Sequence, residues 1–387
     1  MAKPIRIALN IDLQWPIKRH HEVYAGIQDY ARQHAPDWAL IPDLFPAQWI
    51  APRGKMPAYD AVIGRIAPTV AKAARKQAIP IVNVWSNSPI RNEVPSVLTD
   101  YVEAGRMAGE HLVSRGLRRL AGVGYRRDVA TTMYFQGLKE VARSRGIPLS
   151  LHLANFTDSD NENNWHRYTN NANAWINGWQ LPVGVASSYD DHSRYLAMMC
   201  LRRGIQIPEQ IAFIGANDEF LQCEGSEPTL SSIDMGKYRQ GFLAAELLDK
   251  LLKGEPAPTE PIMAPPAELV ARASTDVYQV ADRTVARAMR FIAENCGRKI
   301  RIADVAAGVD CSLQKLERLF RQSGRRPINE EIVALRIELT KRLLIGSNDA
   351  IEDVAAKAGF GTAQHMRHVF RHQLKTTPTA FREKYQK

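Results

Sequence analysis

A short pattern that occurs twice near the end of this 387-residue chain constrains its fold more than any other feature. Ile302 begins one copy and Ile351 the other, and both follow the spacing Ile-x-x-Val-Ala before a glycine-containing turn. After each turn comes a second stretch whose apolar residues recur at helical spacing. Short amphipathic helices joined by tight turns must bury their apolar faces against one another. The repeat therefore predicts two helix-turn-helix units about 50 residues apart, joined by a longer helix over 329–345.

The second stretch of each unit has an apolar face and a polar face. The apolar stripes comprise Leu313, Leu316, Leu319 and Phe320 in the first unit, and Met366, Val369, Phe370 and Leu374 in the second. Ser312 and Thr362 are candidate N-caps, because their hydroxyl oxygens can accept backbone N–H bonds. The polar residues predicted to face outward are Gln314, Lys315, Glu317, Arg318, Arg321, Gln364, His365, Arg367, His368 and Arg371. Each of them is also typical of an ordinary solvated helix.

The net charge of the chain lies entirely in this region. Residues 283–387 contain 21 Lys and Arg against 11 Asp and Glu, a net of +10, whereas residues 1–282 contain 30 of each sign. A basic segment beside a neutral one is typical of a nucleic-acid-binding domain joined to a regulatory domain. Arg and Gln can read guanine and adenine edges, and Glu can accept a hydrogen bond from cytosine. The outward residues are therefore predicted to contact double-stranded DNA, with the two units in successive major grooves.

The neutral segment alternates between apolar strands and amphipathic helices. Apolar runs such as 4–10, 120–124 and 210–215 are separated by stretches with helical spacing. This order is typical of a doubly wound parallel sheet with helices on both faces. Ligands of such sheets bind beyond the carboxyl ends of the strands, so residues that directly follow strands are candidates for binding.

Several stretches of this segment resemble the sugar-sensing domain of LacI/GalR repressors. They are Val97-Leu-Thr-Asp100, Ala104-Gly105, His111-Leu112, Ile207-Pro-Glu-Gln-Ile-Ala-Phe-Ile-Gly215, Thr229-Leu-Ser-Ser-Ile-Asp and Met235-Gly236. The resemblance covers about residues 5–272. It implies an α/β, periplasmic-binding-protein-like domain, with two lobes built on doubly wound parallel sheets and a sugar bound between them.

The same resemblance indicates six candidate ligand-binding residues: Trp15, Trp85, Asp100, Tyr134, Asp190 and Asn217. Asp100 and Asp190 match family aspartates at strand ends, although helix capping is an alternative role for Asp100. Asn217 stands where the family usually has a sugar-binding aspartate, and Tyr134 lies where it often has an arginine. Trp15 and Trp85 each follow a strand and can stack on a sugar ring, or can pack as ordinary core or rim residues.

The basic segment resembles the DNA-binding domain of AraC-family transcription activators. Matching positions include Leu316, Phe320, Gly324, Pro327, Arg336, Leu343, Leu344, Ile351, Val354, Ala355, Gly359, Phe360, Phe370, Thr377, Pro378, Phe381 and Arg382. His365-Met366 and Thr376 depart from the Tyr-Phe and Gly that are common in the family. The resemblance implies an all-α domain with two helix-turn-helix units over 283–387. The predicted sensor domain then spans 1–273, with a linker over 274–282.

A sensor of the first kind followed by a DNA-binding domain of the second resembles bacterial regulators of xylose catabolism. The resemblance implies a sequence-specific regulator, an activator that contacts RNA polymerase. It also implies a homodimer that pairs through its sensor lobes, with a small sugar as effector and D-xylose as the leading candidate. One alternative is the same architecture with a different sugar or sugar derivative as its effector. The other is a DNA-binding regulator whose front domain only dimerises.

Other classes of protein find no support in the sequence. Cys200, Cys223, Cys296 and Cys311 form no C-x-x-C pair, so reduced thiols are expected and neither a disulfide nor a zinc site is. The chain contains no G-x-S-x-G, H-E-x-x-H or Walker motif, so we expect no catalytic site, no metal and no cofactor. No apolar run approaches the roughly 18 residues of a membrane span, and the N-terminus does not resemble a signal peptide. These features predict a cytoplasmic protein with no membrane partner.

Overall fold

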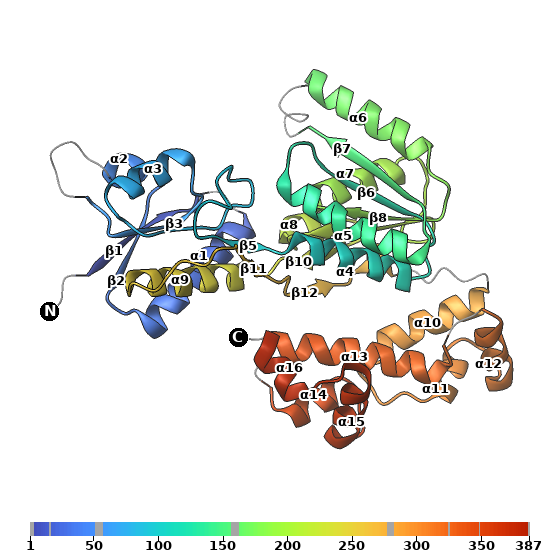
Figure 1. The fold of residues 1–387 in the computed structure, drawn as a ribbon. Coiled ribbons are helices and arrows are strands. Elements are labelled where there is room, and N and C mark those ends of the chain that lie inside the picture. Colours follow the sequence, from blue (N-terminus) through green and yellow to red (C-terminus); the bar gives the residue numbers. More distant parts are fainter. Residues whose placement is uncertain are drawn as a thin grey trace. The chain divides into compact units, whose positions relative to one another are not determined.

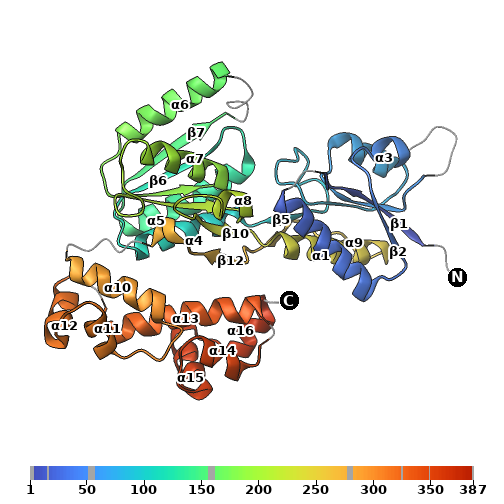
Figure 2. The ribbon, with the colours of Figure 1, turned by 180° about the vertical axis from the view of Figure 1, so that it is seen from behind.

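The computed structural model describes residues 4–14, 17–50, 57–155, 162–276, 282–323, 326–347 and 349–385. The chain divides into two compact units. The first runs to Thr275 and the second begins at Asp276, with the short segment 114–117 grouped with the second. Figures 1 and 2 show the helices and strands of each unit from opposite sides.

The first lobe of the first unit is built on a four-stranded parallel sheet in the order β2-β1-β3-β4. The strands are β1 (Ile5–Asn10), β2 (Trp38–Pro42), β3 (Ala61–Gly64) and β4 (Ile81–Asn83). Helices α1 (Lys18–His34) and α9 (Lys237–Leu252) pack on the face that carries Ile7 and Leu9. Helices α2 (Ala47–Ile50) and α3 (Pro68–Lys76) pack on the face that carries Ala8. Burial on both faces is what the apolar run over 4–10 predicts for a central parallel strand.

Helix α9 joins this lobe from more than 200 positions away because two glycines allow its backbone to approach α1 closely. A Cβ atom on Gly26 would lie 2.0 Å from the carbonyl oxygen of Tyr238. A Cβ atom on Gly241 would lie 2.0 Å from the carbonyl oxygen of Val23. Any larger residue at either position would force the two helices apart.

The second lobe is built on a six-stranded sheet in the order β12-β10-β9-β8-β6-β7. Its strands are β6 (Leu120–Tyr125), β7 (Leu149–Ala154), β8 (Val183–Ser187), β9 (Ile211–Ala216), β10 (Ser231–Asp234) and β12 (Glu268–Val270). All neighbouring strands are parallel except β10 and β12. Figures 1 and 2 show α4 (Tyr101–Ser114) and α5 (Val129–Arg145) on one side of the sheet, and α6 (Glu162–Asn177) and α7 (Asp190–Leu201) on the other. The predicted doubly wound architecture is confirmed.

The chain crosses between the lobes at three places. Strand β5 (Val97–Thr99) leads into α4, β10 leads back into α9, and β11 (Ile262–Ala264), which pairs with β5, leads into β12. Side chains at the start of α9 connect these crossings by hydrogen bonds. Lys237 Nζ donates to Thr99 Oγ1 at 2.7 Å, and Gln240 Nε2 donates to the carbonyl oxygen of Val97 at 2.8 Å.

The second unit is all α-helical. Its helices are α10 (Arg283–Asn295), α11 (Ile302–Gly308), α12 (Leu313–Gln322), α13 (Ile328–Gly346), α14 (Ile351–Lys357), α15 (Ala363–Leu374) and α16 (Pro378–Tyr385). They form two apolar cores, one around α10–α12 and one around α14–α16. Helix α13 spans both, because Ile328 and Ile332 pack in the first core and Ile337 and Leu344 in the second. The two predicted helix-turn-helix units are confirmed, as is the longer helix between them.

Some local predictions were wrong. Leu313, which was predicted to lie in the buried stripe of the first unit, is 40% exposed because it is the first residue of α12. Ser312 occupies the N-cap position, but its side chain makes no capping hydrogen bond. Helix α1 begins at Lys18, whereas helical spacing of apolar residues in the sequence predicts a start at His21. Strand β2 was not predicted, because its residues are only partly buried and show no clear alternation.

Candidate DNA-binding surface and interlobe site

Helix α12 presents the polar residues predicted for the first unit. Leu316 and Phe320 are buried beneath the helix, while Gln314, Lys315, Glu317, Arg318 and Arg321 are all exposed. Among the described residues none of these five forms an ion pair or hydrogen bond with another side chain, so their donors and acceptors are available to a partner. A basic, exposed second helix of this kind is the element that enters the major groove in helix-turn-helix proteins.

Helix α15 presents the residues predicted for the second unit. Met366 and Phe370 are buried, while Gln364, His365, Arg367, His368 and Arg371 are exposed. The hydroxyl of Thr362 accepts the backbone N–H of His365 at 3.1 Å, so the predicted N-cap is confirmed. Arg367 also donates to Glu352 of α14 at 2.7 Å, an exposed pair that orients the guanidinium without burying it.

The turn before α15 depends on a glycine and on an arginine of α13. Gly359 has φ +77°, and a Cβ atom there would lie 2.1 Å from the carbonyl oxygen of Cys296. Arg336 donates to that same carbonyl at 3.1 Å and to the carbonyl of Arg298 at 2.9 Å. The segment that follows α10 is therefore tied both to α13 and to the turn of the second unit.

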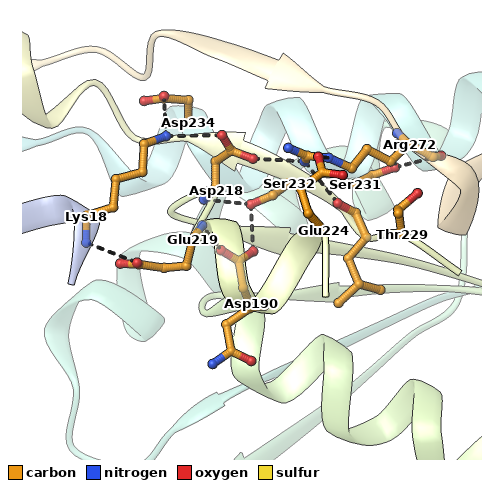
Figure 3. A network of polar contacts seen from close by, with 12 residues as sticks. Lys18, Asp190, Asp218, Glu219, Glu224, Thr229, Ser231, Ser232, Asp234 and Arg272 are labelled. Carbon is orange, nitrogen blue, oxygen red and sulfur yellow. Dashed lines mark hydrogen bonds and ion pairs between the residues drawn. The ribbon is translucent and has the colours of Figure 1, made fainter. Parts of the chain in front are cut away.

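The lobes of the first unit are bridged by Lys18, the first residue of α1 (Figure 3). Its Nζ lies 3.1 Å from Asp218 Oδ2 and 3.0 Å from Asp234 Oδ2, and both carboxylates follow or end strands of the second lobe. Its backbone N–H donates to Glu219 Oε2 at 3.1 Å. Arg272 pairs with the other oxygen of Asp218 at 2.8 Å, as an ion pair rather than a directed hydrogen bond. The carboxyl ends of β9 and β10 are thereby held against the start of α1.

Glu22, one turn further along α1, faces the same acidic group. Its Oε1 lies 3.6 Å from Lys18 Nζ. Burial, together with the charge of Asp234, raises the pKa of Glu22 to about 7, although Lys18 acts in the opposite direction. The network therefore holds more carboxylates than its cations neutralise at neutral pH.

Asp190, a predicted ligand contact, is enclosed by the second lobe. It is 2% exposed, its Oδ1 accepts from Ser232 Oγ at 2.6 Å, and its Oδ2 accepts from the backbone N–H of Glu219 at 2.9 Å. Burial is the main reason that the pKa of Asp190 rises to about 7. These contacts give Asp190 a positioning role, because it holds β10 and the segment after β9 in place beside α7 (Figure 3).

Asn217, which follows β9, has unused hydrogen-bonding capacity. It is 5% exposed, and its Oδ1 accepts no hydrogen bond from any residue that the structure describes. Its backbone has φ +102° and that of Asp218 has φ +51°, a region in which Asn and Asp are the most tolerated residues apart from Gly. An unsatisfied buried amide beside a strained turn is an arrangement typical of functional sites.

The other predicted ligand residues lie in different environments. Trp85 is half-buried, and the guanidinium of Arg65 lies 4.8 Å from the centre of its ring. Asp100 Oδ1 accepts the backbone N–H of Glu103 at 2.9 Å, as expected for the capping alternative. Tyr134 is fully buried, and its pKa is raised by burial and then by the charge of Asp190. Trp15 lies outside the described residues.

Sequence reasoning missed several residues at the boundary between the lobes. Tyr189 Oη donates to Asp128 Oδ2 at 3.2 Å, and Asn87 of the first lobe donates to Asp128 Oδ1 at 2.7 Å. Tyr125 Oη donates to Asp191 Oδ2 at 2.7 Å. Tyr125 ends β6, while Asp128 and Tyr189 follow β6 and β8, so their position after strands was a signal that could have identified them.

Comparisons with known proteins agree with these two units. Residues 110–275 match a periplasmic binding protein-like domain, and residues 305–384 match a helix-turn-helix domain. The chain is 28% identical over 315 residues to the xylose operon regulatory protein of Escherichia coli K12, with 79% of each chain covered. It is 27% identical over 293 residues to the Haemophilus influenzae protein of the same name, with 74% of each covered. A solved structure of the xylose-binding transcription activator xylR superposes with a TM-score of 0.59 at 23% identity, over 100% of both chains, and supports the fold.

The folds, the two sites and these matches define a transcriptional regulator in which a periplasmic-binding-protein-like sensor precedes an AraC-type helix-turn-helix domain. Within this class, the chain resembles the xylose operon regulatory proteins. Its named relatives are regulators of transcription rather than enzymes. In the part of the chain that the structure describes, no helix is both long and apolar enough to cross a membrane, and no three metal-ligating side chains cluster.

Proposed function

We propose that this protein is a cytoplasmic regulator that reads tandem DNA half-sites with α12 and α15 and responds to a small sugar bound between its sensor lobes. The relatives named for the xylose operon make D-xylose the leading candidate. Activation through RNA polymerase and pairing of two copies through the sensor lobes are parts of the same proposal. The sensor segment has no net charge and the helical domain is strongly basic, which supports assigning DNA binding to the helical domain and ligand binding to the sensor.

The observation that carries the sensor half of the proposal is the buried amide of Asn217. A buried carbonyl oxygen without a donor costs roughly 1–3 kcal/mol, and a sugar hydroxyl can remove that cost by donating to it. Asn217 lies at the carboxyl end of β9, next to the carboxylates that Lys18 bridges from the other lobe. A sugar that binds there would contact the turn whose Asp218 pairs with Lys18 of the other lobe.

This arrangement supports control by a shift in population. Among the described residues, three crossings and a few polar bridges connect the lobes, so we expect the free-energy difference between open and closed arrangements to be small. A sugar that contacts both lobes binds the closed arrangement better than the open one. Closure in turn changes how the two copies pair and how their DNA-binding units meet the half-sites.

A sugar panel combined with operator binding tests the proposal. Thermal shift and calorimetry on the full chain, against pentoses, hexoses and sugar acids, should identify one class that binds. That class should then alter operator binding, measured by fluorescence anisotropy. Asn217→Ala should weaken sugar binding about tenfold, whereas Asn92→Ala, at an exposed turn of the first lobe, should not. No binding across the panel, with operator binding intact, would favour a front domain that only dimerises.

A further inference from the structure

Two arginines stand at the carboxyl ends of the first-lobe strands, where ligands of doubly wound sheets bind. Arg65 directly follows β3, and Arg19 is the second residue of α1, the helix that follows β1. Neither belongs to the Lys18 network. Their position faces the second lobe, because the guanidinium of Arg19 lies over the ring of Tyr189 at the end of β8.

Both guanidinium groups are held by aromatic rings. The Cζ atom of Arg65 lies 4.8 Å from the centre of the Trp85 ring, and that of Arg19 lies 5.8 Å from the centre of the Tyr189 ring. Stacking fixes the plane of a guanidinium but leaves the N–H groups along its edge free. Within the described ranges neither Arg19 nor Arg65 forms an ion pair. Each group is therefore restrained by a ring, and neither guanidinium donates a hydrogen bond to any residue that the structure describes.

The two positive charges also act on each other. Arg65 is exposed to solvent, yet partial desolvation, followed by the charge of Arg19, lowers its pKa, and only Asp12 acts in the opposite direction. The charges of both arginines also act on His20. Burial is the main cause that lowers the pKa of His20, and the two arginines lower it further, while its hydrogen bond to the backbone of Asp12 acts in the opposite direction. Like charges that act on each other in this way are stabilised by a bound anion.

The carboxylates nearby already have donors. Asp12 Oδ1 accepts the backbone N–H of Gln14 at 3.0 Å. Asp128 accepts from Tyr189 and Asn87, and Asp191 accepts from Tyr125. Each of these three carboxylates therefore accepts at least one hydrogen bond, whereas within the described ranges neither guanidinium group has a hydrogen-bond partner. A ligand that only accepts hydrogen bonds suits this imbalance better than a neutral sugar, whose hydroxyls both donate and accept.

We propose that Arg19 and Arg65 bind an anionic group, a carboxylate or a phosphate, on the effector. This inference rests on the proposed sugar sensor, and it replaces the neutral D-xylose that the relatives' names suggest with a sugar derivative, either a sugar acid or a sugar phosphate. Asn217 and the arginines then act together, the amide on a sugar hydroxyl and the guanidiniums on the anion. Bidentate pairing of a planar guanidinium with a carboxylate or phosphate fixes the orientation of the ligand as well as its charge.

Calorimetry on the full chain with matched ligands tests this inference. The probes are D-xylose, its sugar acid D-xylonate and a pentose phosphate, D-xylulose 5-phosphate. We expect one of the two anions to bind at least about tenfold more tightly than D-xylose, and the tighter of them identifies the source of the anionic group. Its affinity should also fall as the salt concentration rises.

Variants separate recognition of the anion from folding. Arg19→Gln and Arg65→Gln should each lower the affinity for the anion by about tenfold or more, and the affinity for D-xylose by much less. Arg75→Gln removes the same charge from an exposed position on α3 and should change neither of these two affinities. Thermal unfolding of each variant reports on the fold. Tighter binding of D-xylose, or equal losses for neutral and anionic ligands, would overturn this inference and leave the sugar sensor standing. If no probe binds and the wider sugar panel is also negative, both proposals fail.

Discussion

Replacing Lys18 with methionine should loosen the boundary between the sensor lobes. The ammonium group lies within 3.1 Å of Asp218 and Asp234, which belong to the other lobe, and methionine keeps most of the apolar stem. Asp218 would retain Arg272, but Asp234 and Glu22 would lose their cation. The variant therefore removes the charge that holds the lobes together without creating a large cavity.

The size of the effect follows from partial burial. The side chain of Lys18 is 27% exposed, and those of Asp218 and Asp234 are 16% and 21% exposed. Exposed ion pairs contribute up to about 1 kcal/mol, and breaking a buried pair costs about 3–5 kcal/mol. We expect about 1–3 kcal/mol here, which reduces the ratio of closed to open lobes roughly fivefold to 150-fold.

Small-angle X-ray scattering and calorimetry measure the two consequences. Lys18→Met should increase the radius of gyration of the full chain and weaken the tightest ligand of the sugar panel. Lys72→Met, which removes an exposed lysine from α3 in the same lobe, is the matched control. Unchanged scattering and unchanged ligand affinity in Lys18→Met would refute the bridging role.

Three further variants test separate parts of the structure. Because burial and Asp234 raise the pKa of Glu22 to about 7, its protonated form favours the folded state; the associated stability is lost as pH rises through 7. The wild-type protein should gain stability when the pH falls from about 8 to about 6, and Glu22→Gln should reduce that gain by about 1 kcal/mol in thermal melts. A variant with the same pH profile as the wild type would contradict this. Gly359→Ala should destabilise the helical domain by at least about 2 kcal/mol, seen as a lower melting temperature of its circular dichroism, because φ is +77° and the carbonyl of Cys296 lies in the way. Arg318→Ala should weaken operator binding by roughly 1–3 kcal/mol and relax specificity at one base, whereas an equal loss on random DNA would indicate a phosphate contact.

The long periodic elements could be predicted from the sequence because burial alone specifies them. The apolar stripe of α15 lies beneath the helix, with Met366 and Phe370 fully buried. Strand β9 was recognisable because every residue in it is buried, as in a central parallel strand. Short elements such as β5 and β11 carry no periodic signal, and their pairing depends on residues more than 160 positions apart.

The site was less predictable than the fold, because its geometry depends on distant residues. Asn217 and Asp190 were predicted from the resemblance to LacI/GalR sensors, but sequence alone could not show that Asp190 accepts hydrogen bonds from Ser232 and Glu219. Lys18 resembled any solvated lysine at the start of a helix. Only the folded chain brings it to Asp218, which lies 200 positions away. Arg19 escaped notice for the same reason, since the ring beneath it comes from the other lobe.

The central claim is that a ligand bound between the sensor lobes controls DNA binding by the helical domain. Footprinting of the full chain on its operator, with and without the tightest ligand of the sugar panel, tests this most directly. We expect the ligand to change the affinity for the operator or the number of protected half-sites, and Asn217→Ala to require about tenfold more ligand for the same change. An identical footprint and affinity at saturating ligand would contradict it.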